Sequence, residues 1–374
     1  MADLKMAPSV TRVDFLINKM TAGGAERVIS LLANHLCQDP AYRVRVITFQ
    51  GEDAYPLDER VERVRLHRVF LFRSVVVNGF FQLLWFYRKK KNRPDVMSSH
   101  IDLLGYLTIP VAFFYGIPLI VSEHNNHKAN NSRWQRFLWN YLYRIPKAVT
   151  ILTGYDLEHF RKKNRRVVVM PNPCTFPLFN APAGHTRRRE ILSIGSLNRY
   201  HQKGYDNLIP IMAEVLPHFP EWKLKMVGGG DQGKALLESL VQKHGLKGQI
   251  EFMGIRSDVQ ELLRCAEIFI LPSRFEGLPM VLLEAMSQGI ACISYDCVSG
   301  PSDVIAGGEN GVLVPDQQPA KMVESLKELM SDEGLRRKYQ QNAPLAMDKF
   351  SLEQVGHSWK TLIREVLNDT KPQH

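Results

Sequence analysis

The second half of the chain alternates short apolar runs with longer amphipathic ones. The short runs have the length of strands: 190–194, 223–227, 250–253, 268–271, 291–294 and 311–314. The segments between them predict helices: 206–216, 233–244, 259–266 and one that starts near Pro279. Strands that are each followed by a helix must run parallel, so the pattern predicts a doubly wound parallel α/β sheet.

The first half repeats this alternation on a smaller scale. Its predicted strands are 13–17, 44–49, 65–69, 118–122 and 148–153, and a helix is predicted over 25–36. A chain of 374 residues exceeds one typical core, so we expect two α/β domains. Pro, Gly and a basic run in 174–189 are typical of a linker. We therefore expect an N-terminal domain over 1–180, a second domain over 181–350, and a helix within 351–374 that packs back toward the first.

The positive charge is concentrated in the first half. Residues 1–180 carry 26 Lys and Arg against 14 Asp and Glu, whereas residues 181–374 carry 22 against 24. A basic half favours an anionic partner, either a phospholipid surface or nucleic acid. No known nucleic-acid-binding module is present, so no nucleic-acid partner is expected.

Two basic segments of this half are rich in aromatic residues. Residues 70–93 have helical spacing and end in RKKKNR, and residues 133–147 read RWQRFLWNYLYRIPK. Such segments either form core helices with a solvated basic end or bind an anionic membrane surface. No run supplies the ~20 uninterrupted apolar residues of a membrane span. Scattered cysteines and the lack of an apolar signal sequence predict a cytoplasmic protein, peripheral at the inner face of the membrane.

Two carboxylates frame the helix that starts near Pro279. Glu276 lies just before it, Glu284 lies in its second turn among apolar residues, and Gly289 is placed to end it. Pro279 suits the first helical turn, where its missing N–H is not needed. Free amides at a helix start favour anions, so this arrangement suits a ligand with hydroxyls and phosphates. Two ordinary surface glutamates would give the same spacing.

Other predicted strand ends carry polar or glycine-rich loops. Gly23 and Gly24 follow the first strand, where backbone can approach a phosphate or simply form a turn. His124 follows strand 118–122 and is either a sugar or phosphate ligand or a core histidine. Arg199 and Lys203 precede a helix and either neutralise a diphosphate or lie in a solvated loop.

Taken in order, the segments GGAER, SEH, PNP, GSLNRYHQKG, VGGG, FMG, EGLPMVLLEAMSQG, GPSDVI and NGVLV resemble family 4 of the retaining glycosyltransferases. The resemblance covers nearly the whole chain and is most marked over 190–315. It implies the GT-B fold, with two Rossmann-like domains and a nucleotide-sugar donor between them. It also implies transfer with retention of configuration, without a metal or other cofactor, and the chain contains no Asp-x-Asp.

The resemblance also implies roles for individual residues. Glu276 would bind hydroxyls of the transferred sugar, Glu284 the ribose, and His124 the sugar near the reacting carbon. Arg199 and Lys203 would hold the diphosphate. Further donor contacts would come from Gly23, Gly24, Gly228, Ile255 (on the base), Gly277, Leu278, Pro279, Met280 and Val281.

One position departs from the family pattern. The family usually has Arg directly after the glycine equivalent to Gly195, and this chain has Ser196. Arg199 is the expected replacement.

The predicted function is transfer from a nucleotide-sugar, with UDP-hexose or UDP-N-acetylhexosamine favoured, to a lipid-linked or polysaccharide precursor of the cell envelope. The resemblance implies that the departing phosphate can accept the acceptor's proton, since the sequence shows no obvious general base. A nucleotide-sugar epimerase of the same fold, or a non-catalytic nucleotide-sugar-binding protein, are the alternatives.

Overall fold

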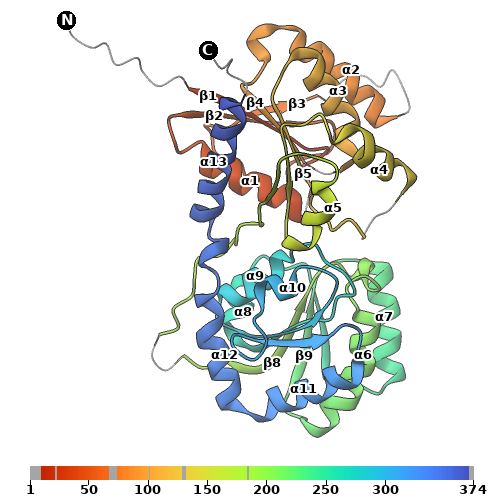
Figure 1. The fold of residues 1–374 in the computed structure, drawn as a ribbon. Coiled ribbons are helices and arrows are strands. Elements are labelled where there is room, and N and C mark those ends of the chain that lie inside the picture. The colour runs from red at the N-terminus through yellow and green to blue at the C-terminus, as the bar shows by residue number, and fades with distance from the viewer. Residues whose placement is uncertain are drawn as a thin grey trace, which may run out of the picture. The chain divides into compact units, whose positions relative to one another are not determined.

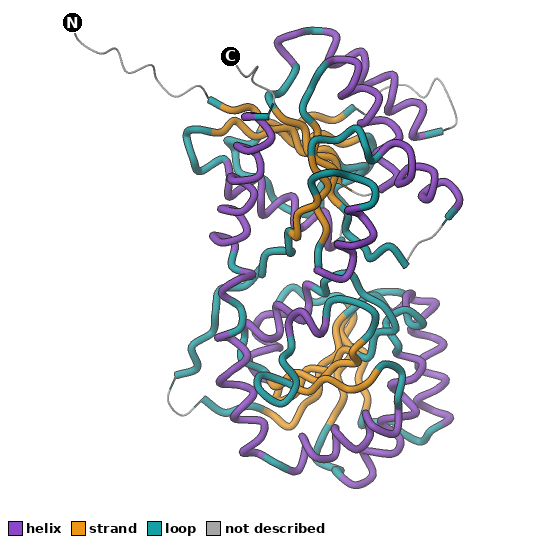
Figure 2. The backbone as a smooth tube through the Cα atoms, in the orientation of Figure 1, coloured by secondary structure: helices purple, strands orange, loops and turns teal. Residues whose placement is uncertain are grey.

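The computed structural model describes residues 10–21, 23–66, 74–100, 102–128, 132–182 and 185–369. The chain forms two compact units, which we call the N-terminal unit (1–173 with 352–374) and the C-terminal unit (174–351). In each unit the strands lie at the centre and helices surround them (Figure 1, Figure 2). This is the predicted α/β architecture, formed twice.

Among its described residues, the N-terminal unit holds a seven-stranded parallel sheet in the order β3-β2-β1-β4-β5-β6-β7. The strands are β1 (Thr11–Leu16), β2 (Tyr42–Thr48), β3 (Glu62–Arg65), β4 (Val96–His100), β5 (Leu119–Ser122), β6 (Ala148–Ile151) and β7 (Val167–Val169). The predicted strand 65–69 thus begins and ends earlier than expected, and its residues 67–69 lie outside the described part.

The described part of the C-terminal unit holds a six-stranded parallel sheet in the order β10-β9-β8-β11-β12-β13. The strands are β8 (Arg188–Ile194), β9 (Lys223–Val227), β10 (Ile250–Gly254), β11 (Ala266–Leu271), β12 (Ala291–Asp296) and β13 (Val312–Pro315). All six had been predicted to within a few residues.

The strand order reverses once in each sheet. In both units the first three strands follow one another toward one edge of the sheet, and the later strands follow one another toward the other edge. The first and fourth strands are therefore neighbours. Right-handed crossovers then place helices on both faces of the sheet. The loops after β1 and β4, and after β8 and β11, diverge at this switch point, which is where open α/β sheets bind ligands.

Helices connect the strands. They are α1 (Gly24–Leu36), α2 (Val75–Arg88), α3 (Gly105–Tyr115), α4 (Arg133–Phe137), α5 (Leu157–Arg161), α6 (Tyr205–Val215), α7 (Asp231–Lys243), α8 (Val259–Cys265), α9 (Met280–Ser287), α10 (Pro301–Val304), α11 (Pro319–Ser331), α12 (Glu333–Leu345) and α13 (Leu352–Asn368). Short turns of 3₁₀ helix are η1 (Lys90–Asn92), η2 (Asp102–Leu104), η4 (Gly154–Asp156), η5 (Leu197–Arg199), η6 (Leu216–His218) and η7 (Asp348–Phe350), and η3 (Leu138–Leu142) is a π-helical turn.

Strand β4 and helices α3, α5, α10 and α12 had not been predicted. Helix α3 is apolar on nearly every side and contains Pro110, so its sequence lacks the usual amphipathic period. Helix α12 contains Pro344 near its end and starts directly after α11, at the capping residue Asp332. The Asp332 side chain accepts a hydrogen bond from Leu335 N–H at 2.9 Å, which marks the start of a separate helix.

Helix α13 belongs to the N-terminal unit although it follows the C-terminal unit in sequence. It packs against α1, which Figure 1 shows at its side. Gly356 allows this approach, since a Cβ there would lie 2.4 Å from the His35 ring. An ion pair of 2.7 Å between Lys360 Nζ and Asp39 Oδ2 fixes the same contact.

The division between the units falls after Pro173, seven residues before the expected position. The reason is that residues 174–182, expected to form a linker, pack on the C-terminal unit. Cys174 N–H donates to the Phe350 carbonyl at 2.6 Å, and Phe179 N–H donates to the Ser287 carbonyl at 2.9 Å. The guanidinium carbon of Arg264 also lies over the Phe179 ring, 4.6 Å from the ring centroid.

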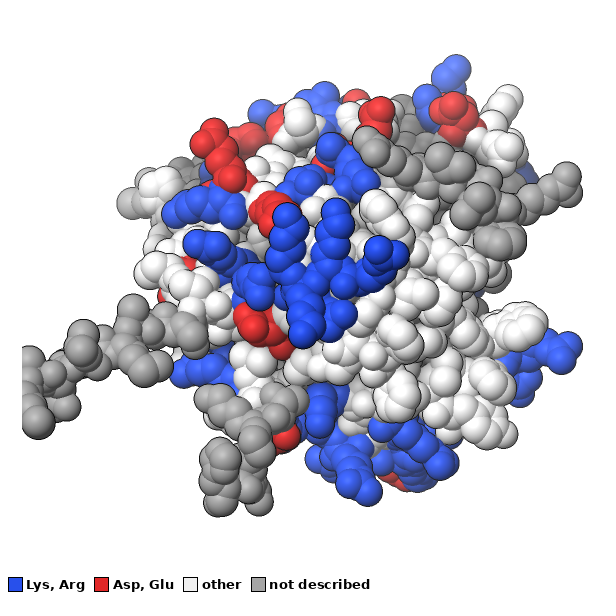
Figure 3. Space-filling view, turned by 90° about the horizontal axis from the view of Figure 1, so that it is seen from above, with Lys and Arg blue, Asp and Glu red and all other residues white. Residues whose placement is uncertain are grey.

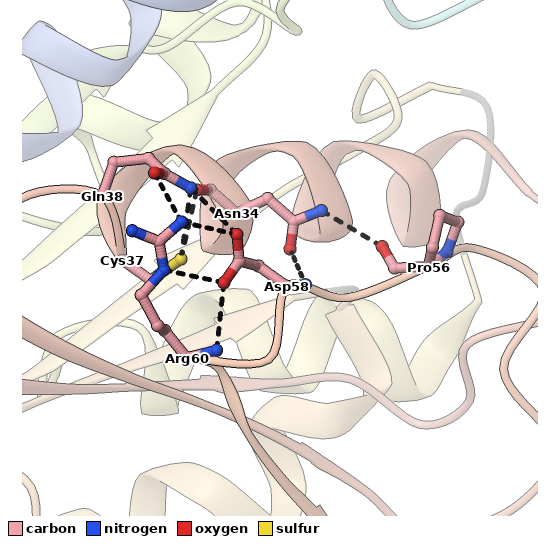
Figure 4. Close-up of polar contacts among 6 residues, drawn as sticks. All are labelled: Asn34, Cys37, Gln38, Pro56, Asp58 and Arg60. Atoms are coloured by element: carbon pink, nitrogen blue, oxygen red, sulfur yellow. Dashed lines mark hydrogen bonds and ion pairs between the residues drawn. The ribbon is translucent and has the colours of Figure 1, made fainter.

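The C-terminal end of α1 is joined to the loop between β2 and β3 (Figure 4). Asn34 accepts a hydrogen bond from Asp58 N–H at 2.8 Å and donates one to the Pro56 carbonyl at 3.1 Å. Arg60 then pairs with the Asp58 carboxylate and donates to Gln38. This network anchors the C-terminal end of α1, the helix whose first turn follows the glycine loop.

The aromatic segment 133–147 is partly buried, so the core alternative holds for some of its residues. Trp134 and Tyr141 are exposed, but Trp139 and Tyr143 are buried. Both buried rings donate a hydrogen bond to the Glu123 carboxylate, Trp139 Nε1 at 3.0 Å and the Tyr143 hydroxyl by a shorter contact. Their polar atoms therefore form hydrogen bonds inside the core, to the residue that precedes His124.

Candidate active site

In the C-terminal unit, the predicted donor residues lie at the switch point of the sheet. Gly195 directly follows β8, and Glu276 lies in the loop after β11. These two strands are the neighbours at which the strand order reverses. The topology alone thus places both loops on the ligand-binding edge.

Lys203 and Glu276 form an ion pair across this switch point. The Lys203 Nζ lies 2.7 Å from Glu276 Oε1, and the Ser273 hydroxyl donates to the same oxygen at 2.6 Å. The Ser299 hydroxyl binds the carbonyls of Glu276 and Gly277 at 2.8 and 3.2 Å, which fixes the loop backbone. The resemblance implies separate roles for these two charged groups, yet they are in direct contact although they lie 73 positions apart in the chain.

Helix α9 begins one residue later than expected. Pro279 is its N-cap with extended backbone, which corrects its placement in the first helical turn. The N–H groups of Leu282 and Leu283 bond back to the Pro279 carbonyl, so the amides of Met280 and Val281 precede the first intrahelical bonds. The helix start therefore has the predicted ability to meet an anion.

The rest of α9 agrees with the sequence. Glu284 is buried in its second turn, between apolar side chains. Gly289 follows the helix in a left-handed conformation, with φ of +61°, and ends it.

Glycines allow the strand ends of this unit to come close together. A Cβ on Gly228 would lie 1.9 Å from the Gly195 carbonyl oxygen, and one on Gly195 would lie 3.3 Å from Lys203 Cε. The Lys203 side chain thus runs across Gly195 toward Glu276 because that position has no side chain. Larger residues here would displace the lysine.

Two other predicted donor residues are exposed at the same edge. Arg199 ends the turn η5, and its guanidinium makes no hydrogen bond or ion pair with any residue that the structure describes. Ile255 follows an irregularity in the pairing of β10 with β9 and is 86% exposed. Its side chain lies over Gly229, since a Cβ on that glycine would be 2.9 Å from it. A cation and an exposed apolar side chain are thus available for a ligand. Ser196 is exposed just before η5, and Arg199, at the end of that turn, remains the expected replacement for the family's usual arginine.

In the N-terminal unit, the glycine loop follows β1. Gly23 is the N-cap of α1 and Gly24 is its first residue, whereas Ala22 lies outside the described residues. A Cβ on Gly23 would lie 2.2 Å from Glu26 Oε2, so the first-turn carboxylate folds over the glycine. A side chain at this position would therefore displace the Glu26 carboxylate.

His124 follows β5 and is hydrogen-bonded to a second histidine. Its Nε2 lies 2.9 Å from Nδ1 of His100, the last residue of β4, and His100 Nε2 lies 2.9 Å from the Ser98 hydroxyl. Burial lowers the pKa of His124 to about 4, and burial together with His124 lowers the pKa of His100. Both rings are therefore neutral near pH 7, and His124 can act as a hydrogen-bond donor or acceptor without being charged.

The sequence did not predict His100 or its support from α13. Trp359 of α13 lies 5.8 Å from the His100 ring, and Phe15 of β1 lies 5.5 Å from it. The polar end of β4 was the available signal, but a histidine within a buried strand is indistinguishable from an ordinary core residue by sequence alone.

Within the described ranges, no group of three or more His, Cys, Asp or Glu could hold a metal ion. Over the same ranges, no helix combines the length and the apolar composition that crossing a membrane requires. All five cysteines are free thiols.

Comparison with known proteins identifies relatives for both units. The family described as glycosyl transferases group 1 matches residues 178–346, and the one described as glycosyltransferase family 4 matches residues 22–175. Over 363 residues the chain is 28% identical to a Campylobacter jejuni enzyme named GalNAc-α-(1→4)-GalNAc-α-(1→3)-diNAcBac-PP-undecaprenol α-1,4-N-acetyl-D-galactosaminyltransferase, covering 96% of this chain and 99% of that one. It is 27% identical to the amylovoran biosynthesis glycosyltransferase AmsD of Erwinia amylovora, over 91% of this chain and 96% of the relative.

Solved structures show the same fold. A sucrose-phosphate synthase from Thermosynechococcus elongatus aligns with a TM-score of 0.79 at 17% identity, covering 96% of this chain and all of that one. HepE of Anabaena in complex with UDP and glucose aligns with a TM-score of 0.78 at 16% identity, covering 95% and 100%. At this level of identity the likeness concerns the fold, and the predicted GT-B architecture is confirmed.

Proposed function

Because the chain belongs to the family 4 glycosyltransferases, we propose that it is a retaining, metal-independent hexosyl- or N-acetylhexosaminyltransferase that uses a UDP-sugar. The observation that carries the proposal is the Lys203–Glu276 pair at the switch point, with Arg199 and the α9 amides on the same edge of the C-terminal unit. This set offers cations for a diphosphate and a carboxylate for sugar hydroxyls, the two parts of a nucleotide-sugar.

The charge distribution fits the departure of a nucleoside diphosphate. Negative charge develops on the diphosphate as its bond to the sugar breaks, and preorganised cations and amides stabilise it. Arg199 has no competing carboxylate partner among the described residues, so it can turn toward phosphate. Lys203 is held by Glu276 at 2.7 Å, so that one positioned pair would contact both phosphate and sugar.

For the acceptor, we propose a lipid-linked or polysaccharide precursor. The names of two relatives support this: one acts on a glycan linked to PP-undecaprenol, and another takes part in amylovoran biosynthesis. Each match covers more than nine tenths of this chain and of the relative. The similarity therefore includes both units, and not only the unit with the predicted donor residues.

A surface of the N-terminal unit supports a peripheral membrane location. We call it the basic–aromatic patch; its members are Trp85, Arg88, Lys89, Lys90, Lys91, Phe113 and Phe114. Trp85 is 68% exposed with Lys89 Nζ 5.8 Å from its ring, and Phe113 and Phe114 are 73% and 70% exposed. The Tyr115 hydroxyl donates to the Leu84 carbonyl at 2.7 Å and so brings the ends of α2 and α3 together.

This patch lies on the edge of the sheet opposite the ligand edge. Lys90 and Lys91 precede the amino end of β4, and Arg12, at the amino end of β1, donates to the Lys91 carbonyl. Figure 3 shows Lys and Arg side chains gathered on one face beside uncharged residues. Basic residues next to exposed aromatic rings suit an anionic phospholipid surface. Binding there would leave the loops after β1, β4 and β5 open.

The donor proposal is tested by a hydrolysis screen over UDP-, GDP- and ADP-sugars with wild type and Glu276→Gln. We expect turnover with a UDP-sugar, a loss of at least about 100-fold in the variant, and an unchanged thermal shift by UDP. Glu267→Gln is the matched control, because Glu267 forms an ion pair of 3.2 Å with Arg336 at the opposite end of β11. Equal losses in both variants, or a free epimer as the product, would contradict the proposal.

The membrane proposal is tested by sedimentation with vesicles of phosphatidylglycerol and phosphatidylcholine. Wild type should bind anionic vesicles at low salt and dissociate as salt rises, and Lys89→Glu with Lys90→Glu should abolish the binding. Lys321→Glu with Lys327→Glu on α11 makes the same charge change on the other unit. Failure of wild type to bind would refute this location.

A further inference from the structure

The two predicted diphosphate cations lie on one short loop of the C-terminal unit, residues 196–204, which we call the cation loop. Lys203 N–H donates to the Arg199 carbonyl at 2.8 Å, so the two residues lie one turn apart. Gly204 N–H closes the next turn by donating to the His201 carbonyl at 3.2 Å. These backbone bonds fix the two cations relative to each other. Where the pair lies in the unit depends on what holds the ends of the loop.

The start of the cation loop is attached to the first turn of α7. Leu197 N–H donates to the Gly229 carbonyl at 2.8 Å. Asn198 Oδ1 accepts a hydrogen bond from Gly233 N–H at 2.9 Å. A Cβ on Gly233 would lie 1.9 Å from the Leu197 carbonyl oxygen, so the loop and the helix pack backbone against backbone. The helix that follows β9 therefore places the first half of the loop.

The end of the cation loop is held by Arg274, which lies in the loop after β11. Its backbone N–H donates to the Gln202 carbonyl at 2.9 Å. Its Nη1 donates to the His201 carbonyl and, at 2.6 Å, to Oδ1 of Asp206 in the first turn of α6. The side chains of Arg274 and Asp206 are 19% and 24% exposed. One partly buried side chain thus joins the cation loop and the next helix to the loop that carries Glu276.

This arginine has a role distinct from that of the other cations on the same edge. Its guanidinium is bound to the Asp206 carboxylate and to a carbonyl, whereas the Arg199 guanidinium makes no such bond within the described part of the chain. A hydrogen bond between charged groups is roughly twice as strong as a neutral one, and partial burial protects it from screening by salt. Arg274 is therefore suited to hold the loop, and Arg199 and Lys203 are suited to meet a ligand.

We propose that Arg274 is a positioning residue that holds Arg199 and Lys203 in place for the diphosphate of the donor; this rests on the glycosyltransferase function proposed above. Cations that are already in place bind a diphosphate without first having to be ordered, and they stabilise its developing charge more strongly. Loss of the Arg274 side chain removes the bonds to the His201 carbonyl and to Asp206. The diphosphate must then order the end of the loop itself, beside a carboxylate that has lost its arginine.

The defect should be confined to the diphosphate part of the ligand. The residues expected to meet the base and the ribose are Ile255, directly after β10, and Glu284, buried in α9, and neither belongs to the cation loop. A displaced cation loop should therefore weaken a nucleoside diphosphate and leave its nucleoside unaffected. A general loss of structure in the unit would weaken both ligands alike.

The experiment measures the Kd of UDP by calorimetry and that of uridine by ligand-observed NMR. If wild type binds GDP or ADP instead, that nucleotide is used together with its own nucleoside. Arg274→Ala should raise the Kd of the diphosphate by about 10-fold or more, the usual effect of losing a hydrogen bond to a charged group, and leave the Kd of the nucleoside unchanged. Arg274→Lys should recover most of the affinity, because its ammonium group can still donate to the Asp206 carboxylate.

Arg336→Ala is the matched control, because Arg336 also binds a carboxylate and backbone carbonyls in the C-terminal unit, but at the amino end of β11. It should lower the melting temperature and leave both Kd values unchanged. Arg274→Met keeps an apolar stem and provides the same test if Arg274→Ala fails to fold. An unchanged Kd for the diphosphate, or equal losses for diphosphate and nucleoside, would overturn the proposal. If wild type binds none of UDP, GDP and ADP, the proposed function itself fails, so the two failures are distinguishable.

Discussion

Gly204 is a residue at which the candidate donor site should be highly sensitive to one added methyl group. It lies between Lys203 and Tyr205, caps α6 and has a left-handed backbone with φ of +69°. A Cβ there would lie 1.9 Å from the Pro272 carbonyl oxygen, on the loop that carries Glu276. An ordinary contact begins at 3.4 Å, so the two loops must separate by about 1.5 Å in Gly204→Ala.

This displacement is enough to break the ion pair. If the separation is transmitted in full, the 2.7 Å distance between Lys203 Nζ and Glu276 Oε1 becomes about 4.2 Å, beyond the usual limit of a salt bridge. Misplacing reacting groups by about 1 Å typically costs about 100-fold in rate. We therefore expect a loss of about 100-fold in turnover of the nucleotide-sugar, measured as release of UDP.

The control separates the clash from the cost of the backbone conformation. Gly245 has the same φ of +69°, but a Cβ there meets nothing within 4 Å. Gly245→Ala should lose only the ~1–2 kcal/mol of stability that a left-handed alanine costs, with turnover unchanged. If Gly204→Ala and Gly245→Ala lose the same stability and neither loses activity, the argument from close packing is refuted.

Two further predictions concern the stability of the N-terminal unit. Burial lowers the pKa of His124 to about 4 in the folded protein. The folded state therefore resists protonation of this ring, and the free energy of unfolding should fall by up to about 3 kcal/mol as pH drops from 6.5 toward 4. His124→Gln should flatten that slope in urea unfolding at several pH values. Asn34→Ala removes both bonds to the loop of Pro56 and Asp58, and should cost about 1–3 kcal/mol by the same assay at pH 7.

The C-terminal sheet and most of the N-terminal one could be predicted because parallel strands are short, apolar and separated by amphipathic helices, whereas β4 ends in the polar residues Ser98, Ser99 and His100 and was missed. This pattern gave all six strands of the C-terminal sheet and the helix around Glu284. It missed α3, since a helix buried on most sides has no polar face to set a period. It also put the boundary after residue 180, because Pro and Gly predict irregular backbone but not which unit that backbone packs on.

The candidate site could be predicted residue by residue, but its contacts could not. The sequence indicates Lys203 and Glu276 for separate reasons, and only the structure shows that they meet at neighbouring strand ends. The partners of histidines were harder still. His100 bonds to His124 from β4, 24 residues earlier, and Asp156 bonds to His127 from the turn η4, 29 residues later. Nothing in the loop sequence EHNNH indicates either pairing.

The position of α13 has a consequence for how the protein is made. The ring of Trp359 completes the packing around Phe15 and His100, yet it is translated after the whole C-terminal unit. Domains commonly fold during synthesis from the N-terminal end. Here the first unit to emerge from the ribosome must wait for the last helix, so the second unit completes its fold first. A stalled nascent chain that ends before Leu352 should therefore hold a protease-resistant C-terminal unit and a loosely packed N-terminal one.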